Sequence, residues 1–157
     1  MYAAIDRAKR NLLVVGAGLL ACVATAPRAA SKQSPGAIEQ PSIASDEAFI
    51  ERAFAMRRQA LDNGDQGYGA VVVRDGRIVA QSPSRVVSDN DPSAHAEMEA
   101  IRQAARNLRS RDLSGCTLYS STAACPMCES AAYWAGIDRQ VAGRALSDGG
   151  RPRLCGR

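Results

Sequence analysis

Residues 69–80 read GAVVVRDGRIVA, and this stretch decides most of what the sequence says about the fold. Asp75-Gly76 separates two short runs that contain β-branched side chains, and Asp-Gly in that setting is the strongest short signal for a β-hairpin. We therefore expect two antiparallel strands, over residues 69–74 and 77–80, joined by a tight turn.

Helical patterns stand on both sides of this hairpin. Upstream, Ser45 is a good N-cap and apolar residues recur at helical spacing, so we expect a helix over residues 46–62. Downstream, Asp91-Pro92-Ser93 opens a second helix with apolar residues at core spacing. The apolar stripes comprise Ile50, Ala53, Phe54 and Leu61 in the first helix and Ala94, Met98, Ile101, Ala105 and Leu108 in the second.

The rest of the chain alternates between strand and helix. We expect a strand at 117–120, a helix that begins at Cys125 and a further strand at 139–142. This order of elements predicts an α/β fold, a three-layer α/β/α sandwich. Its mixed sheet would start with the N-terminal β-hairpin, and helical crossovers would join the later strands.

The first 45 residues differ in composition from the rest. Residues 1–26 combine a basic start with an apolar stretch, as in an export signal, and Leu19-Leu20-Ala21-Cys22 resembles a bacterial lipoprotein box. The protein would then be exported, either periplasmic or attached to the membrane through a lipid on Cys22. The alternatives are a transmembrane helix and a misplaced start codon, which would leave the protein cytoplasmic. Residues 27–45 are expected to be a disordered linker, which leaves 46–157 as a single domain.

The formal charge of +4 on this 157-residue chain is concentrated near the N-terminus. Residues 1–45 hold five Lys or Arg and two Asp or Glu, whereas residues 46–157 hold fifteen and fourteen. We therefore expect no strong nucleic-acid binding by the domain. One basic run is a candidate phosphate patch, although such runs are more often solvated helix faces. It comprises Arg102, Arg106, Arg109 and Arg111.

Two motifs carry the chemistry: His95-Ala96-Glu97 and, about thirty residues later, Cys125-Pro126-Met127-Cys128. One imidazole and two thiols supply three of the four tetrahedral positions of zinc and leave the fourth for water. Two residues apart on a helix, His95 and Glu97 point in different directions, so we expect the zinc beyond the helix end, with Glu97 approaching from another side. A structural zinc site and a pair of buried free cysteines are the alternatives.

By these motifs the chain resembles the cytidine and deoxycytidylate deaminase superfamily over about residues 46–143, closest to its bacterial guanine deaminase and nucleoside deaminase branch. The resemblance rests on NDPSAHAE at 90–97 and on CPMC at 125–128, followed by AYWA at 132–135. It implies the fold of the cytidine deaminase type and a homodimer. The site residues it implies are the zinc ligands His95, Cys125 and Cys128, the catalytic Glu97, and substrate contacts at Ser84, Ala94 and Trp134.

The activity implied by this resemblance is hydrolytic deamination of a small molecule, a free nucleobase or nucleoside, with guanine the best single choice. Zinc-bound hydroxide would attack the ring carbon that carries the amine, and Glu97 would move the protons. Two alternatives stay open. One is an adenosine deaminase acting on tRNA, whose branch usually lacks the Tyr133-Trp134 pair; the other is a zinc-binding, deaminase-like protein that is impaired in catalysis.

Three features depart from the family pattern. Ser84 stands where this branch usually has an Asn that contacts the base or sugar, and Ala123-Ala124 replaces the usual Glu-Pro before the first Cys. The fold is also expected to be truncated at its C-terminus, because residues 149–157 replace a longer segment that helps to close the active site. Trp134 lies on a predicted helix and is equally well explained as a core residue. The departures predict an altered substrate pocket around an intact set of metal ligands.

Overall fold

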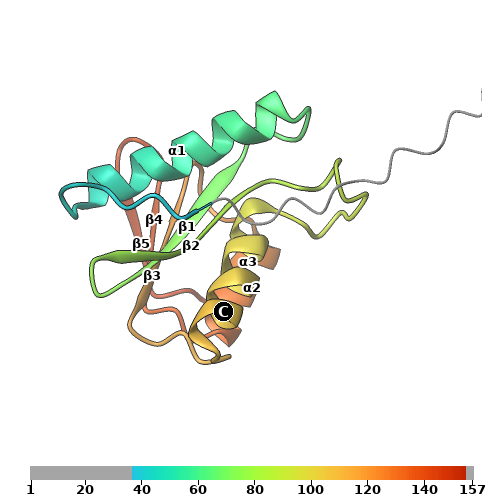
Figure 1. The fold of residues 1–157 in the computed structure, drawn as a ribbon. Coiled ribbons are helices and arrows are strands. Elements are labelled where there is room, and N and C mark those ends of the chain that lie inside the picture. Colours follow the sequence, from blue (N-terminus) through green and yellow to red (C-terminus); the bar gives the residue numbers. More distant parts are fainter. Residues whose placement is uncertain (1–36, 155–157) are drawn as a thin grey trace, which may run out of the picture. The chain divides into compact units, whose positions relative to one another are not determined.

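The predicted hairpin is present in the computed structural model, which describes residues 37–154 (Figure 1). Strand β1 is Gly69–Arg74 and strand β2 is Arg77–Pro83. Asp75 and Gly76 have φ angles of 51° and 69°. Both central residues of the turn are therefore left-handed, as the tight type I′ hairpin turn requires.

The sheet has five strands in the order β2-β1-β3-β4-β5, and it is mixed, because β3 and β4 pair in parallel while the other pairs are antiparallel. The predicted α/β class and mixed sheet are confirmed. Strand β5 was not predicted, since its sequence SDGG has no β-branched or aromatic residue. The remaining elements are α1 (Asp46–Asp62), α2 (Ala96–Leu108), β3 (Cys116–Ser120), α3 (Pro126–Trp134), β4 (Arg139–Ala142) and β5 (Ser147–Gly150).

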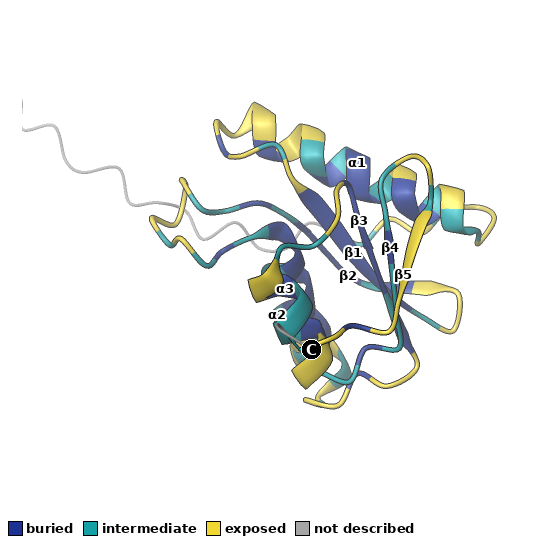
Figure 2. Ribbon diagram, turned by 180° about the vertical axis from the view of Figure 1, so that it is seen from behind, coloured by how far each residue is buried: buried dark blue, intermediate teal, exposed yellow. Residues whose placement is uncertain are grey.

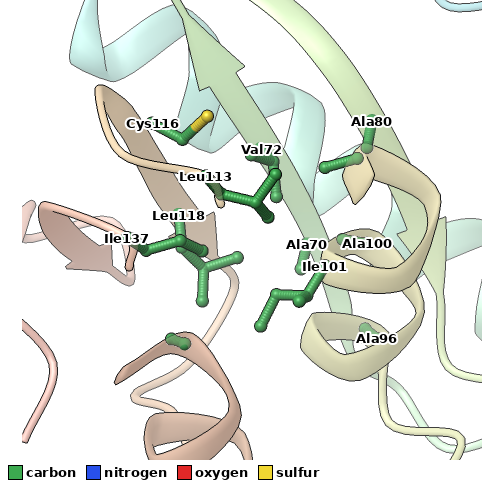
Figure 3. Packing of buried hydrophobic residues seen from close by; sticks show 12 residues of the cluster. Ala70, Val72, Ala80, Ala96, Ala100, Ile101, Leu113, Cys116, Leu118 and Ile137 are labelled. Atoms are coloured by element: carbon green, nitrogen blue, oxygen red, sulfur yellow. The ribbon is translucent and has the colours of Figure 1, made fainter. Parts of the chain in front are cut away.

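Helix α1 covers one face of the sheet, and α2 and α3 cover the other (Figures 1 and 2), which confirms the predicted three-layer sandwich. Strand β1 serves both layers because successive side chains point to opposite faces. Ala70 and Val72 belong to the core cluster under α2 and α3, whereas Val71 and Val73 belong to the cluster under α1. Figure 3 shows the first of these clusters at close range.

The first helix has the predicted bounds and cap. Ser45 Oγ accepts a hydrogen bond of 3.2 Å from the Ala48 amide, which satisfies one of the free N–H groups of the first turn. Of the four residues predicted to face the core, three are buried: Ile50, Ala53 and Phe54. The prediction was wrong for the fourth, Leu61, which is 55% exposed.

The second helix begins later than predicted, at Ala96. Asp91 does not open the helix because its carboxylate folds back over a turn and accepts hydrogen bonds of 2.7 Å from both the amide and the hydroxyl of Ser93. His95 consequently becomes the N-cap of α2, with extended backbone angles, instead of lying inside the first turn.

The segment before α1 packs on the domain. Gln40 Nε2 donates to the Ile78 carbonyl at 2.7 Å, and Gln40 Oε1 accepts from the Ile78 amide at 2.9 Å. Ile38 packs against the core cluster under α1. The linker expected over residues 27–45 is therefore corrected at its end, since ordered packing starts by Ile38 and not at Ser45.

The export signal predicted over residues 1–26, with its lipidation site at Cys22, lies outside the described residues. It stays a prediction. Among residues 37–154, no helix is both long enough and apolar enough to cross a membrane.

Asp46, the first residue of α1, forms hydrogen bonds with two residues of the sheet, Tyr119 in β3 and Arg139 in β4. Its carboxylate accepts hydrogen bonds from Tyr119 Oη at 2.6 Å and from the Arg139 guanidinium at 2.9 and 3.2 Å. Arg139, and after it Tyr119, hold the pKa of Asp46 below its usual range. Because the pKa is lower in the folded state, this stabilisation is complete above the ordinary Asp pKa of about 4 and is lost as the pH falls through the lowered value.

Replacing Asp46 with Asn should therefore lower the free energy of unfolding at pH 7 by at most about 1 kcal/mol, because a side chain that is 33% exposed is screened by water. The loss should shrink toward pH 3, where the carboxylate is being protonated. Urea unfolding at both pH values measures it, with Asp62→Asn at the other end of α1 as the control. Equal losses at pH 7 and pH 3 would contradict the ion-pair explanation.

Candidate metal centre

The two motifs meet where the N-termini of α2 and α3 come together. His95 is the N-cap of α2, Cys125 is the N-cap of α3, and Cys128 lies in the first turn of α3. His95 Nδ1 is 3.7 Å from Cys125 Sγ and 3.6 Å from Cys128 Sγ, and the two sulfurs are 3.6 Å apart. The structure thus brings together the three predicted ligands, at helix ends as the spacing implied.

These separations fit zinc. Tetrahedral zinc with bonds of about 2.3 Å to sulfur and about 2.0 Å to nitrogen would place two sulfurs about 3.8 Å apart, and a nitrogen and a sulfur about 3.6 Å apart. The observed separations of 3.6–3.7 Å differ from these by no more than about 0.2 Å. Three protein ligands leave a fourth tetrahedral position, so the side chains fit an open zinc site.

The surroundings of Cys128 disfavour the charged form of its thiol. Burial, followed by the nearby Glu97 carboxylate and Cys125, raises the pKa of the Cys128 thiol well above its usual range. A thiol in such surroundings stays protonated in the absence of a metal. A bound divalent cation would shift the equilibrium from the thiol to the thiolate, because it stabilises the negative charge on sulfur directly. The N-terminus of α3 also favours a negative charge at this position.

Glu97 borders this set of ligands without belonging to it. Its side chain lies in the first turn of α2, where the residue is 5% exposed. Glu97 Oε2 is 3.8 Å from Cys128 Sγ. Burial raises the pKa of Glu97 above its usual range, which favours the form that carries a proton. A buried carboxyl group beside an open metal position is suited to exchange protons with a molecule held there.

The three residues expected to contact substrate have different surroundings. Ala94 is buried and directly precedes the ligand His95. Ser84 is 2% exposed, and its hydroxyl donates to Asp65 Oδ1 at 2.9 Å, so this side chain is engaged within the protein. Trp134 is the last residue of α3, about 12 Å along the helix from the metal-centre end. It is 75% exposed, so the structure places it neither in the core nor beside the ligands.

The basic run of α2 points away from the metal centre. Arg106, Arg109 and Arg111 are exposed and lie at or beyond the C-terminal end of α2, the end remote from the metal ligands. Arg102 is engaged in an ion pair with Glu99. The run therefore fits a solvated helix end better than a phosphate-binding patch beside the reaction site.

The sequence did not reveal one buried residue that contacts the connection before His95, namely Asp65, in the loop between α1 and β1. It is 6% exposed, although aspartate in a Gly-Asp-Gln-Gly turn is ordinarily a surface residue. No local signal in the sequence shows that this carboxylate turns inward, because all but one of its partners lie about twenty residues away along the chain.

Replacing Cys128 with Ala should release the zinc, because two remaining protein ligands hold it far less tightly than three. The zinc content after dialysis against a weak chelator should fall from about one per chain to near zero. Cys116→Ala is the matched control, since both thiols are fully buried at 0% exposure and Cys116 lies in β3. Similar zinc contents in the two variants would contradict the assignment of the ligands.

The comparisons with known proteins agree with this geometry. The family model of the cytidine and deoxycytidylate deaminase zinc-binding region matches residues 43–144. Guanine deaminase of Bacillus subtilis (strain 168) is 44% identical over 90 residues, which are 57% of this chain and 58% of that protein. The tRNA-specific adenosine deaminase of Aquifex aeolicus is 35% identical over 95 residues, which are 60% of this chain and 63% of that protein.

A solved structure confirms the type of fold. The X-ray structure of guanine deaminase from Bacillus subtilis superposes with a TM-score of 0.60 at 40% sequence identity, and the match covers 63% of each chain. The match thus spans less than two thirds of the length of each of these relatives.

Proposed function

Because the chain belongs to the cytidine and deoxycytidylate deaminase family, we propose that it catalyses the zinc-dependent hydrolytic deamination of a free nucleobase or nucleoside. One observation carries this proposal: an imidazole nitrogen and two sulfurs stand 3.6–3.7 Å apart where two helix N-termini meet, with buried Glu97 beside them. A closed structural site would use four protein ligands and would need no such carboxyl group.

In this proposal each side chain has one task. His95, Cys125 and Cys128 hold the zinc, which when bound supplies a Lewis acid that lowers the pKa of a water. Glu97 takes a proton from the attacking water and returns protons to the ring nitrogen and to the departing amine. Water and the amine-bearing ring carbon thereby become a ring carbonyl and ammonia.

Guanine is the substrate that we propose first. The 44% identity to a guanine deaminase supports it, as does the near-neutral charge of residues 46–157. A polyanionic substrate needs free cations close to the reacting base. Within residues 37–154, the arginines at the segment leading to His95 are instead paired. Arg85 lies in this segment and is paired with Asp89. Arg102 contacts Ser93 of the segment and is paired with Glu99.

The second candidate is an adenosine deaminase acting on tRNA. The 35% identity to a tRNA-specific adenosine deaminase favours it.

Two further predictions concern assembly and location. The resemblance to the family implies a homodimer, and the N-terminal sequence predicts export or membrane attachment through Cys22.

Ammonia release by the purified, zinc-loaded full chain tests the proposal. The substrates are guanine, adenine, cytosine, their nucleosides and, in a separate arm, tRNA. We expect ammonia from guanine or another small substrate, with loss of activity on chelation and recovery when zinc is restored. Ammonia from tRNA alone would favour the second candidate. Zinc-loaded protein that releases none from any substrate would leave only the impaired, deaminase-like protein.

A further inference from the structure

We propose that Asp65 is a positioning residue of the metal centre. Its buried carboxylate fixes the connection between β2 and α2, residues 84–95, and through this connection it orients His95. The inference rests on the proposed function only in taking His95 as a zinc ligand.

The carboxylate of Asp65 links two loops by hydrogen bonds: its own loop between α1 and β1, and the connection between β2 and α2. It accepts hydrogen bonds from the amides of Gln66 at 2.8 Å, Val87 at 3.0 Å and Ser88 at 2.9 Å, and from the hydroxyls of Ser84 and Ser88, both at 2.9 Å. All of these bonds except the one from Gln66 come from residues 84–88. The five bonds together exceed the roughly four lone-pair sites of a carboxylate, so no acceptor site is left free.

Two backbone hydrogen bonds link residues 85 and 86, next to the Asp65 partners, to the residues that precede His95. The Arg85 amide donates to the Ala94 carbonyl at 3.0 Å, and the Asp91 amide donates to the Val86 carbonyl at 3.1 Å. The connection therefore closes on itself, and the residue next to Ser84 is bonded to the residue next to His95. Holding residues 84–88 in place restrains the backbone from which the imidazole of His95 projects.

The site requires a charged acceptor and not merely a polar group of the same size. Burial acts to raise the pKa of Asp65, yet the hydrogen bonds from Ser88, Ser84 and Gln66 together hold it below its usual range. Asparagine would replace one acceptor oxygen by an NH₂ group that faces other donors. At 6% exposure little water can satisfy the groups left unpaired.

Asp65→Asn is the direct test, because it keeps the shape of the side chain and removes half of its acceptors. Groups that orient metal ligands typically contribute about 10–100-fold to metal affinity, so we expect zinc to bind at least about tenfold more weakly in competition with a chromophoric chelator. In the cobalt(II)-substituted protein the ligand-field bands should change, while the sulfur-to-cobalt charge-transfer bands, which report Cys125 and Cys128, should remain.

Asp89→Asn is the matched control. Asp89 lies in the same connection, and its carboxylate accepts hydrogen bonds from Arg85. Its side chain is 38% exposed, and within residues 37–154 it forms no hydrogen bond with Asp65 or with the proposed metal ligands. We expect it to bind zinc like the wild type. Ser88→Ala, which removes a single hydrogen bond to Asp65, is the milder variant and should weaken zinc binding less than Asp65→Asn does.

The outcomes separate positioning from simple stabilisation. Weaker zinc binding and altered ligand-field bands in Asp65→Asn, graded in Ser88→Ala and absent in Asp89→Asn, would support the proposal. A folded Asp65→Asn variant with wild-type zinc affinity and cobalt spectrum would overturn it; if that variant does not fold, unchanged zinc affinity in Ser88→Ala would do so. Failure of the wild type to release ammonia would refute the proposed function and not this inference.

Discussion

Replacing Glu97 with Gln should leave zinc bound and lower turnover by about 10²–10⁴-fold, the usual contribution of a positioned general acid–base group. The three residues that could hold the zinc are His95, Cys125 and Cys128, so we expect the metal content not to change. The amide has nearly the same shape as the carboxylate but cannot take up and return a proton. We therefore expect kcat for ammonia release to fall much more than KM rises.

Glu99→Gln is the matched control for this experiment. Glu99 also lies in the first turn of α2, and its carboxylate is engaged with Arg102. We expect its turnover to stay within about twofold of the wild type, because this partly buried carboxylate, 20% exposed, is paired with Arg102 and does not belong to the candidate metal-binding group. Undiminished turnover in Glu97→Gln would refute the proton-shuttle role, and loss of zinc from that variant would show that Glu97 is a ligand.

Gly69→Ala should severely destabilise the fold. A Cβ atom on Gly69 would lie 2.2 Å from the Ala53 carbonyl oxygen, 2.3 Å from the Arg57 nitrogen and 2.7 Å from the Met56 carbonyl carbon. All three are backbone atoms of α1, so no side chain can rotate away to make room. We expect a loss of at least about 3 kcal/mol in the free energy of unfolding, at or above the usual range for overpacking.

Strand β1 cannot relieve this collision by moving alone. The Gly69 amide donates to Ser121 Oγ at 3.2 Å, and its carbonyl accepts from the Ser121 amide at 2.9 Å. Urea unfolding compares the variant with Gly149→Ala, where a Cβ would meet only Gln140 atoms, at 3.6 and 3.8 Å. The control should lose less than about 1 kcal/mol. Similar stabilities for the two variants would contradict the close helix-to-sheet approach.

Local signals explain why so much of the fold could be predicted. Asp75-Gly76 marks its own turn, and Ser45 caps its own helix, so neither depends on distant residues. Strand β5 is different, because its polar Ser147–Gly150 sequence becomes a strand only by pairing with the edge of β4. Such pairing depends on the fold and leaves no local pattern.

In the candidate site, too, some features could be predicted from local sequence and others depend on contacts between distant residues. The candidate metal ligands could be predicted because zinc sites use imidazole and thiol groups, and Cys125 and Cys128 stand at a spacing typical of such sites. The N-termini of α2 and α3 bring His95 to this pair of cysteines. The role of Asp65 could not be found, because it depends on contacts with Ser84, Val87 and Ser88 across two loops. The exposure of Trp134 was equally hidden, since only Cys128 and Ala132 of the short α3 are buried and its outward side carries no distinctive pattern.

The most direct test of an open zinc centre is X-ray absorption at the zinc edge of the purified 157-residue chain. We predict one zinc per chain with two sulfurs at about 2.3 Å and two nitrogen or oxygen atoms at about 2.0–2.1 Å, one from His95 and one from a small molecule. Three or four sulfurs around the metal would mean a closed structural site. That result, or a shell without sulfur, would contradict the account.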